Sequence, residues 1–330
     1  AKVRELILKR IFALLGILGC VAALPSATRA QSTFPDHPVK VICGFPAGSS
    51  LDIVTRVASR SLEEGMGQPF VVENRAGATG NLAAEFVARS PADGYTLLTG
   101  GSSQAISMSA FQKLNFNIEA DFEPVALIAN MPMILVVNSS LGVNSVAELI
   151  ALAESKPGEL TFGSPGVGSI PHMSAELFNL MAGVKITHVP YRGTNQVLVD
   201  LISGRLSMMF APAPTLAGQH DNPNLKILAV SSQAESDLVP GVKPLNKLGL
   251  PNFETTLWNA IWAPKGTPKA IVSALNRVVM TASETPAVKK MLADNGVDPM
   301  PDNEDQVAQF ISDDVKKWKK VVDFAGIKME

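Results

Sequence analysis

The strongest constraint on the fold is a regular alternation of short apolar runs with stretches whose apolar residues recur at helical spacing. VKVICGF (39–45) has the composition of a strand, and residues 53–62 carry apolar side chains on one helical face. QPFVVEN (68–74), NLAAEFVAR (81–89) and GYTLLTG (94–100) continue the pattern as strand, helix and strand. This succession is typical of βαβ units around a parallel sheet. We therefore predict an α/β fold.

The second half of the chain repeats the alternation between two long extended runs. These runs are MPMILVVN (131–138) and LWNAIWAPKG (257–266). At about 150 residues per domain, the length suggests two domains. We predict that the two runs are crossings between a first lobe of residues 31–131 and 256–330 and a second lobe of residues 132–255. The pattern alone equally allows two consecutive domains.

The first thirty residues differ from the rest. Four basic residues lie among positions 2 to 10, followed by the apolar run IFALLGILGCVAAL and then a short segment ending at Ala30. This order predicts a signal peptide over residues 1–30 and a periplasmic protein. The run is shorter than the ~20 residues of a membrane span, which disfavours an anchor helix. ILGC (17–20) resembles a lipobox, but cleavage at Ala30 is favoured over lipidation of Cys20, because apolar sequence continues beyond that cysteine.

Charge and cysteine content exclude several classes of protein. The predicted leader holds five of the 28 basic and one of the 30 acidic residues, which leaves 23 basic and 29 acidic residues and a net charge of −6. Nucleic-acid binders carry basic patches, so we expect no nucleic acid as a partner. Cys43 is the one cysteine beyond the leader. It should be a buried thiol without a disulfide partner.

The sequence lacks the common motifs of enzymes and metal sites. It has no G-x-S-x-G elbow, no P-loop, no dinucleotide fingerprint, no H-E-x-x-H and no C-x-x-C. The histidines, His37, His172, His188 and His220, are scattered along the chain. We therefore predict a protein that is not an enzyme and that holds neither metal nor cofactor.

Four loops rich in Gly, Ser, Thr or Asn follow predicted strands and open predicted helices: 44–51, 99–107, 163–174 and 191–197. In open α/β sheets, ligands bind outside the carboxyl ends of the strands, where such loops lie. The first N–H groups of a helix have no partners and carry about half a positive charge. Several converging helix starts can therefore hold an anion without Lys or Arg. Residues 44–51, 99–107 and 163–171 include no charged residue, so a small carboxylate is the expected ligand.

Each loop also has a simpler interpretation as the capped start of its own helix. Ser49-x-x-Asp52 fits a capping box, Thr194 an N-cap, and Ser169 with Pro171 an ordinary helix start.

Three further side chains leave alternatives open. His172 is either a hydrogen-bond donor to a ligand or a residue on a helix surface. Trp258 and Trp262 lie four apart, hence on one face of a strand, where core packing is favoured over ligand stacking.

Several segments carry a family resemblance: HPVKVICGFPAGSSLDIV, VVENRAGATGN, DGYTLL, ELTFGSPGVGS, HVPYRGTNQ and LWNAIWAPKGTP. With these segments, essentially the whole chain beyond the leader resembles the Bug-type extracytoplasmic receptors, the substrate-binding proteins of tripartite tricarboxylate transporters. The resemblance implies a two-lobed periplasmic-binding-protein fold of type II, like a Venus flytrap, with crossing hinge strands. It also implies a carboxylated metabolite held in the cleft by backbone N–H groups and ordered water, and membrane subunits of the transporter as partners.

The family motifs map onto individual positions. The family's PAGGGTD is PAGSSLD here, G-x-G-T is GVGS, and Tyr-Lys-Gly is Tyr191, Arg192 and Gly193. Ala211 stands where the family often has Asp, which disfavours amino acids as ligands. Arg192 is the expected partner of a second carboxylate, whereas Asp52 is expected to be a cap. The predicted ligand contacts are Phe45, Ala47, Gly48, Ser49, Ser50, Ser102, Ser103, Ser164, Gly168, Ser169, Tyr191, Arg192 and Thr194.

We therefore predict a monomeric, non-catalytic receptor that closes two lobes on a small mono- or dicarboxylate for uptake by a tripartite transporter. One alternative is a secreted hydrolase that uses Ser169 or Ser102. Another is a protein that presents its ligand to a sensor. The effector domain of a transcription regulator is disfavoured, because the leader is present and no helix-turn-helix is found.

Overall fold

The computed structural model describes residues 34–216, 218–219, 221–300 and 304–329. The predicted signal peptide, Cys20 and His220 lie outside these residues. The chain divides into a unit of residues 1–36 and a unit of residues 37–330, and the description below concerns the second unit.

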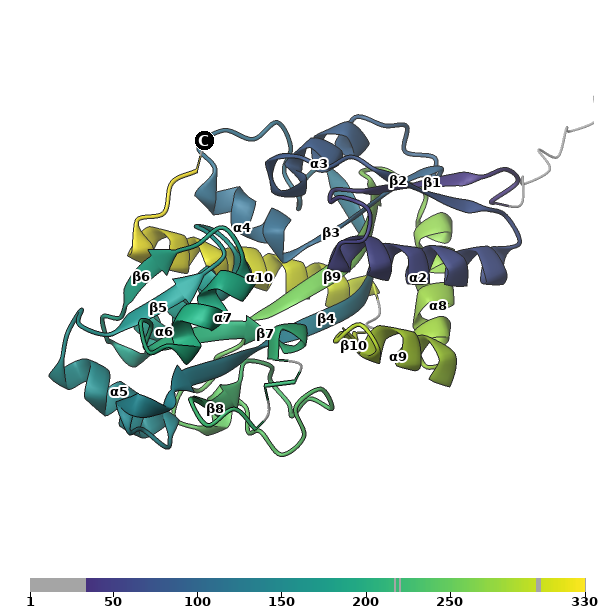
Figure 1. The fold of residues 1–330 in the computed structure, drawn as a ribbon. Helices are drawn as coiled ribbons and strands as arrows, with labels where there is room; N and C mark the ends of the chain where they lie inside the picture. The colour runs from purple at the N-terminus through teal and green to yellow at the C-terminus, as the bar shows by residue number, and fades with distance from the viewer. Residues whose placement is uncertain (1–33, 217, 220, 301–303, 330) are drawn as a thin grey trace, which may run out of the picture. The chain divides into compact units, whose positions relative to one another are not determined.

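The first part of this unit has the predicted alternation of strands and helices (Figure 1). Its elements are β1 (Val39–Cys43), α2 (Ser50–Met66), β2 (Phe70–Asn74), η1 (Ala78–Gly80), α3 (Asn81–Ala88), β3 (Thr96–Gly101), α4 (Ser102–Ala110) and β4 (Phe122–Asn138). Helix α2 shows how the sequence sets its own limits. Ser49 Oγ accepts the N–H of Asp52 at 3.3 Å, and Gly67 ends the helix with φ 75°, a conformation that favours glycine.

The middle part repeats the pattern, and the first strand of the last part pairs with β3 and β4. The middle elements are η2 (Ser139–Leu141), α5 (Val146–Ser155), β5 (Thr161–Ser164), α6 (Ile170–Ala182), β6 (Thr187–Pro190), α7 (Thr194–Ile202), β7 (Met208–Pro212), η3 (Ala213–Leu216), β8 (Leu225–Val230) and η4 (Leu245–Lys247). The last are β9 (Thr256–Pro264), α8 (Lys269–Ser283), α9 (Pro286–Ala293), β10 (Asp298–Pro299) and α10 (Glu304–Ala325).

The described strands pair in the order β2-β1-β3-β9-β4-β7-β5-β6, and β8 and β10 also pair with β4. Strand β1 is parallel to both β2 and β3, and β5 is parallel to β6 and β7. Strands β9 and β4 are antiparallel to their neighbours. The carboxyl ends of β1 and β3 therefore lie at the same edge, which brings the loops before α2 and α4 together.

Strand β4 connects the two groups of parallel strands. It pairs with β9 as far as Pro132 and with β7 from Met133 onward. The second connection lies before β9, where Thr255 donates its N–H to the carbonyl of Ser231 at 3.0 Å. The lobe boundaries predicted from the sequence coincide with this change of partner and stay a prediction.

One predicted strand is longer than expected. The run at 131–138 is only the second part of β4, which has 17 residues and begins at Phe122. Its first part contains Glu123 and Pro124 and two register shifts against β9. These irregularities break the apolar pattern, so the sequence did not predict the first part of β4.

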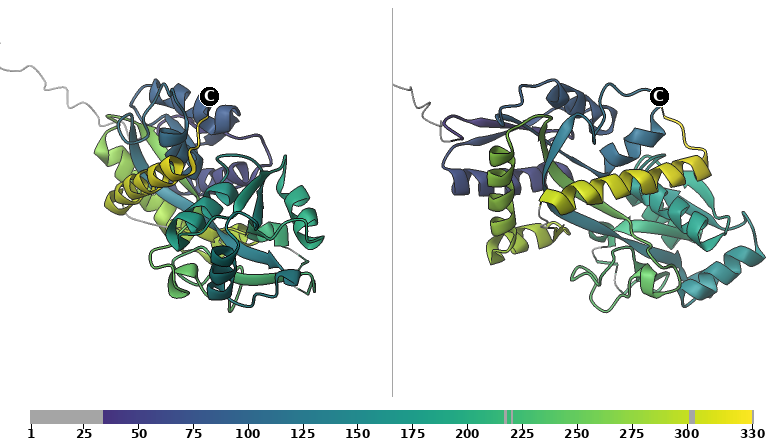
Figure 2. Two further views of the ribbon diagram at one scale, coloured as in Figure 1. Left: turned by 90° about the vertical axis from the view of Figure 1, so that its left-hand side faces the viewer. Right: turned by 180° about the vertical axis from the view of Figure 1, so that it is seen from behind.

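Helices cover both faces of the sheet in the first lobe. The hydroxyls of Thr55 in α2 and Thr99 in β3 lie 2.8 Å apart, which places α2 on one face. On the other face, Trp258 of β9 donates its indole N–H to Asp314 of α10 at 2.7 Å; Figure 2 shows α10 from behind. Trp258 and Trp262 are both buried, so the prediction of core packing is confirmed, as is that of a buried Cys43.

Candidate functional site

The loops after β1 and β3 enclose a cavity of about 160 Å³. Five predicted ligand contacts line it, and Ala47 and Gly48, in the same loop, do not. Of its lining residues, none has a charged side chain. They are Phe45, Ser49, Ser50, Leu51, Gly101, Ser102, Ser103, Leu257, Trp258 and Asn259. We call this cavity the first-lobe pocket.

Two helices begin at this pocket. Ser50 and Leu51 are the first residues of α2, and Ser102 and Ser103 are the first residues of α4. Among the described residues, the N–H groups of these four make no hydrogen bond. Their helices have 17 and 9 residues, so each start also carries a partial positive charge. The pocket therefore offers four amide donors to an anion.

Two buried polar side chains also lack partners. Ser102 is 1% exposed and Asn259 is 4% exposed. Within the described part of the chain, neither side chain makes a hydrogen bond. The polar atoms of both remain accessible from the pocket. A buried amide without partners costs about 1–3 kcal/mol, so Asn259 requires a ligand or water in the pocket.

Sequence reasoning missed Leu257 and Asn259. The signal was available: Asn259 is the one polar residue in the run LWNAIWAP. The alternation of side chains along β9 directs both residues toward α2, opposite to Trp258.

The floor of the pocket depends on one glycine. Gly101 of β3 lies opposite Asn259 of β9, and a Cβ at Gly101 would be 1.9 Å from the carbonyl oxygen of Trp258. Only glycine allows the two strands to approach this closely.

Asp52 fixes the loop before α2. Its carboxylate accepts hydrogen bonds from Gly48 N–H at 2.9 Å, Asn74 Nδ2 at 2.8 Å and Arg56 Nε at 3.0 Å. Asn74 also donates to the carbonyl of Phe45 at 2.9 Å. Burial alone would raise the pKa of Asp52, but the hydrogen bonds from Arg56, Gly48 and Asn74 lower it below its usual value. Asp52 thus orients the loop, in agreement with its predicted role as a cap.

The second-lobe loop lies elsewhere, and its polar groups have internal partners. Ser164 Oγ lies 2.7 Å from His188 Nε2. Ser169 Oγ donates to the carbonyl of Gly166 at 2.7 Å and caps α6 as predicted. The N–H of Gly168 donates to His172 Nδ1 at 3.1 Å. The structure does not bring Ser164, Gly168 or Ser169 to the first-lobe pocket.

The surroundings of His172 decide one of its two predicted alternatives. It is buried, so the alternative of a surface residue is wrong. Its Nδ1 accepts a hydrogen bond, which leaves the proton on Nε2, 3.7 Å from Glu176 Oε1, so the role of a donor to a ligand stays a prediction. Its ring lies 4.1 Å from that of His188, which stacks on Phe162 at 4.9 Å. Burial, with a contribution from His188, lowers the pKa of His172 to about 3, and burial lowers that of His188 to about 4. Both rings are therefore neutral at neutral pH.

The fourth loop is also outside the pocket. Tyr191 donates its hydroxyl to Asp200 at 2.8 Å. Arg192 is exposed, and its backbone N–H donates to Gln196 Oε1 at 3.4 Å. The prediction that Thr194 is the N-cap of α7 is wrong. Gly193 occupies the cap position in extended backbone, and Thr194 is the first residue of the helix.

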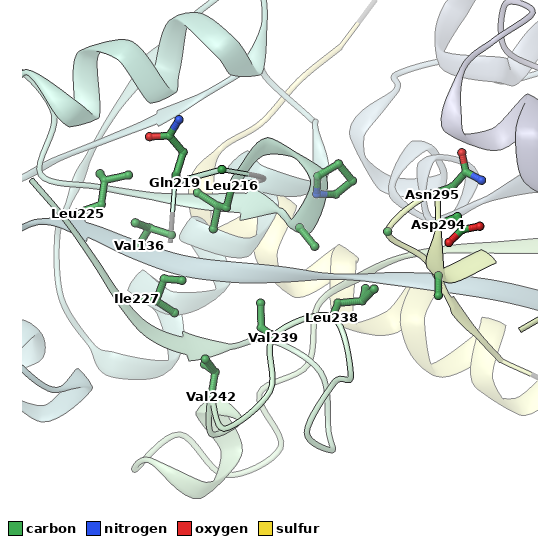
Figure 3. Close-up of a pocket in the computed structure, with 15 residues that line it drawn as sticks. Val136, Leu216, Gln219, Leu225, Ile227, Leu238, Val239, Val242, Asp294 and Asn295 are labelled. Carbon is green, nitrogen blue, oxygen red and sulfur yellow. The ribbon is translucent and has the colours of Figure 1, made fainter. Parts of the chain in front are cut away.

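A larger cavity of about 660 Å³ lies elsewhere in the second unit. Figure 3 shows the aliphatic side chains of β4 and β8 on one side of it and Asp294 and Asn295 on the other. None of the predicted contacts lines it. The polar side chains in its described lining, Gln219, Asp294 and Asn295, are not buried, so none of them requires a ligand, and the smaller first-lobe pocket is the better candidate site.

Two other features are absent from the described residues. No group of three or more His, Cys, Asp or Glu residues there could hold a metal ion. No helix of that part of the chain has the length and apolar character needed to cross a bilayer.

Comparisons with known proteins agree with the geometry. A family profile described as "Tripartite tricarboxylate transporter family receptor" matches residues 54–327. The chain is 36% identical to Protein BugT of Bordetella pertussis, over 97% of this chain and 99% of that protein. It is 32% identical to a UPF0065 protein from the tcbD–tcbE intergenic region of a Pseudomonas species, over 92% and 91% of the two chains.

Solved structures are similar over most of the chain. An R. palustris protein with adipate is 33% identical with a TM-score of 0.71, over 89% of this chain and 99% of that one. MatC from Rhodopseudomonas palustris, with bound malate, is 31% identical with a TM-score of 0.68, over 88% and 100%. A TctC solute-binding protein from Polaromonas, without ligand, is 22% identical with a TM-score of 0.79, over 88% and 99%, and supports the fold alone.

Proposed function

Because the chain belongs to the family of tripartite tricarboxylate transporter receptors, we propose that its first-lobe pocket binds one carboxylate of a small mono- or dicarboxylate. The second lobe then closes over the ligand, and the loaded receptor delivers it to the membrane subunits of the transporter.

Membership of the family confirms several predictions made from the sequence. The resemblance to Bug-type receptors, the two-lobed α/β fold and the role of a periplasmic solute receptor that is not an enzyme all follow from it. The rival hydrolase has no support at the pocket either, since no histidine or carboxylate lines it beside Ser102.

One observation carries the choice of a carboxylate. Four amide N–H groups at two helix starts, together with Ser102 and Asn259, face an uncharged cavity and have no partners among the described residues. Donors in excess and no compensating negative charge favour an anion over a neutral or cationic ligand. The adipate and malate bound to two similar proteins are consistent with this choice.

The contacts from the second lobe remain predictions. Closure would have to bring Ser164, Gly168, Ser169, Tyr191 and Thr194 toward the ligand, although several of their polar groups now have internal partners. Arg192 has a side chain exposed to solvent and is the proposed partner of a second carboxylate. We also propose a monomer released by cleavage after Ala30, rather than a protein anchored by lipid at Cys20; the mass of the mature protein distinguishes the two.

Native mass spectrometry of the protein as purified, followed by thermal shifts against a panel of carboxylates, tests the proposed function. A ligand at a hundred times its dissociation constant should add about 2.7 kcal/mol to the unfolding free energy. Neutral sugars and amines of similar size serve as controls and should produce no shift. Stabilisation by these controls and not by any carboxylate would contradict the proposal.

A further inference from the structure

We infer that Asn259 and Ser102 make the first-lobe pocket selective for acids that carry a hydroxyl group on the carbon next to the bound carboxylate. This inference rests on the proposed function and specifies the ligand of the same pocket.

Hydrogen-bond donors in the pocket are sufficient for the carboxylate without Asn259. The N–H groups of Ser50 and Leu51 in α2 and of Ser102 and Ser103 in α4 lack partners in the described structure. A carboxylate has about four lone-pair sites, which these four donors can fill.

An acceptor is left over. In either orientation of its amide, Asn259 presents one oxygen that can only accept, and Ser102 Oγ can also accept. A carboxylate offers no proton to them. Asn259 is 4% exposed and lines the pocket, so its oxygen takes its donor there, from a water or from the ligand.

A hydroxyl group on the ligand supplies that donor. It donates to the oxygen of Asn259 and accepts from the amide nitrogen or from Ser102 Oγ. An oxo group would only accept and leave the oxygen of Asn259 without a partner. An ammonium group would donate, but no carboxylate of the protein lines the pocket to compensate its charge.

The size of the pocket fits such an end group. Its volume of about 160 Å³ is below the roughly 300–1,000 Å³ of pockets that enclose a whole drug-sized ligand, so it admits an end group and not a long acid. A carboxylate with one hydroxylated carbon has five heavy atoms. The remainder of a longer acid would extend out of the pocket.

Calorimetric titration with matched acids tests the inference. The three-carbon set is both enantiomers of lactate, pyruvate, propionate and L-alanine, and the four-carbon pair is L-malate and succinate. The hydroxy acid should bind about three- to ten-fold more tightly than the acid without the hydroxyl, as expected for one net hydrogen bond. Pyruvate and alanine should bind more weakly than the better enantiomer of lactate.

Substitutions test whether Asn259 and Ser102 cause the preference for hydroxy acids. Asn259→Leu should bind hydroxy and unsubstituted acids equally, while its Tm without ligand stays at or above that of the unsubstituted protein, because an unpartnered amide is replaced by an apolar group. Ser102→Ala should reduce the preference. Asn224→Leu, a change at an exposed asparagine of the second lobe, should leave the preference intact.

The outcomes separate the two claims. If no acid of the panel binds, the proposed function fails and the inference fails with it. If acids bind but hydroxy and unsubstituted acids bind equally, the pocket holds water beside Asn259 and the inference alone is wrong. A preference that survives in Asn259→Leu also overturns it.

Discussion

Replacing the buried carboxylate of Asp314 should destabilise the protein strongly. Its Oδ2 accepts the indole N–H groups of Trp258 and Trp318, each at 2.7 Å. Asp314→Leu keeps a side chain branched at Cγ but leaves two buried donors without an acceptor. Each such donor costs about 1–3 kcal/mol, so the unfolding free energy should fall by about 2–6 kcal/mol. Oδ1 of Asp314 also forms an ion pair with Lys317, and the leucine removes this pair as well; Lys317 keeps one acceptor, the carbonyl of Glu254 at 3.0 Å.

The isosteric Asp314→Asn should cost less. With its amide oxygen in the place of Oδ2, the asparagine can still accept both indole N–H groups. Its NH2 then replaces Oδ1 and cannot accept from Lys317, so the ion pair is lost but the two buried indole donors keep their acceptor. Trp258 also lines the first-lobe pocket, so the leucine variant should in addition bind carboxylates more weakly.

Urea unfolding, followed by tryptophan fluorescence and circular dichroism, measures both variants, and coincident curves license a two-state analysis. Asp313→Leu, at the exposed neighbouring carboxylate, is the matched control and should change stability by no more than about 0.5 kcal/mol. The reasoning is refuted if Asp314→Leu resembles this control, or if Asp314→Asn is the more destabilised of the two variants at this position.

Four further outcomes are expected. Gly101→Ala places a Cβ 1.9 Å from the carbonyl oxygen of Trp258, so it should lower the Tm and abolish ligand-induced thermal shifts; Gly193→Ala, whose Cβ would meet nothing within 4 Å, should do neither. The folded-state pKa of His172, about 3, lies below the unfolded value of about 6.5. The unfolded state therefore binds the extra proton, and His172 should contribute a fall in stability of about 1.4 kcal/mol per pH unit as the pH drops below about 6.5. His188, with a pKa of about 4, adds its own contribution, so His172→Gln should show a shallower fall and not a flat profile. Affinity for a fully ionised carboxylate should not change between about pH 6 and 8, because no titratable side chain lines the pocket; a tenfold change would implicate one. Arg192→Ala should weaken a dicarboxylate more than its monocarboxylate analogue, and equal losses would remove its role.

The strands and helices were largely predictable, because each carries its own local pattern. Ser49 and Ser169 cap helices where the sequence placed caps, and the apolar spacing of α2 identified its buried face. The first part of β4 was not predictable, because its pairing with β9 tolerates Glu123, Pro124 and two register shifts. That tolerance comes from neighbouring strands, which local sequence does not describe.

The candidate site was predictable only where polar groups stay free. A Gly/Ser loop has the same kind of sequence whether its hydrogen-bond donors face a ligand or another part of the protein. The loop at Ser102 keeps its donors free, whereas Ser164 is engaged by His188, 24 residues further along the chain. The opposite error occurred at Asn259, whose setting in an apolar strand suggested nothing about binding. Its function follows from a property that only the fold reveals: it is buried next to two helix starts and has no partner among the described residues. Burial without a partner is not sufficient alone, because both amide atoms of Asn81 are buried without a partner in the described structure and Asn81 does not line the pocket; the position of Asn259 beside two helix starts is what marks it as a ligand contact.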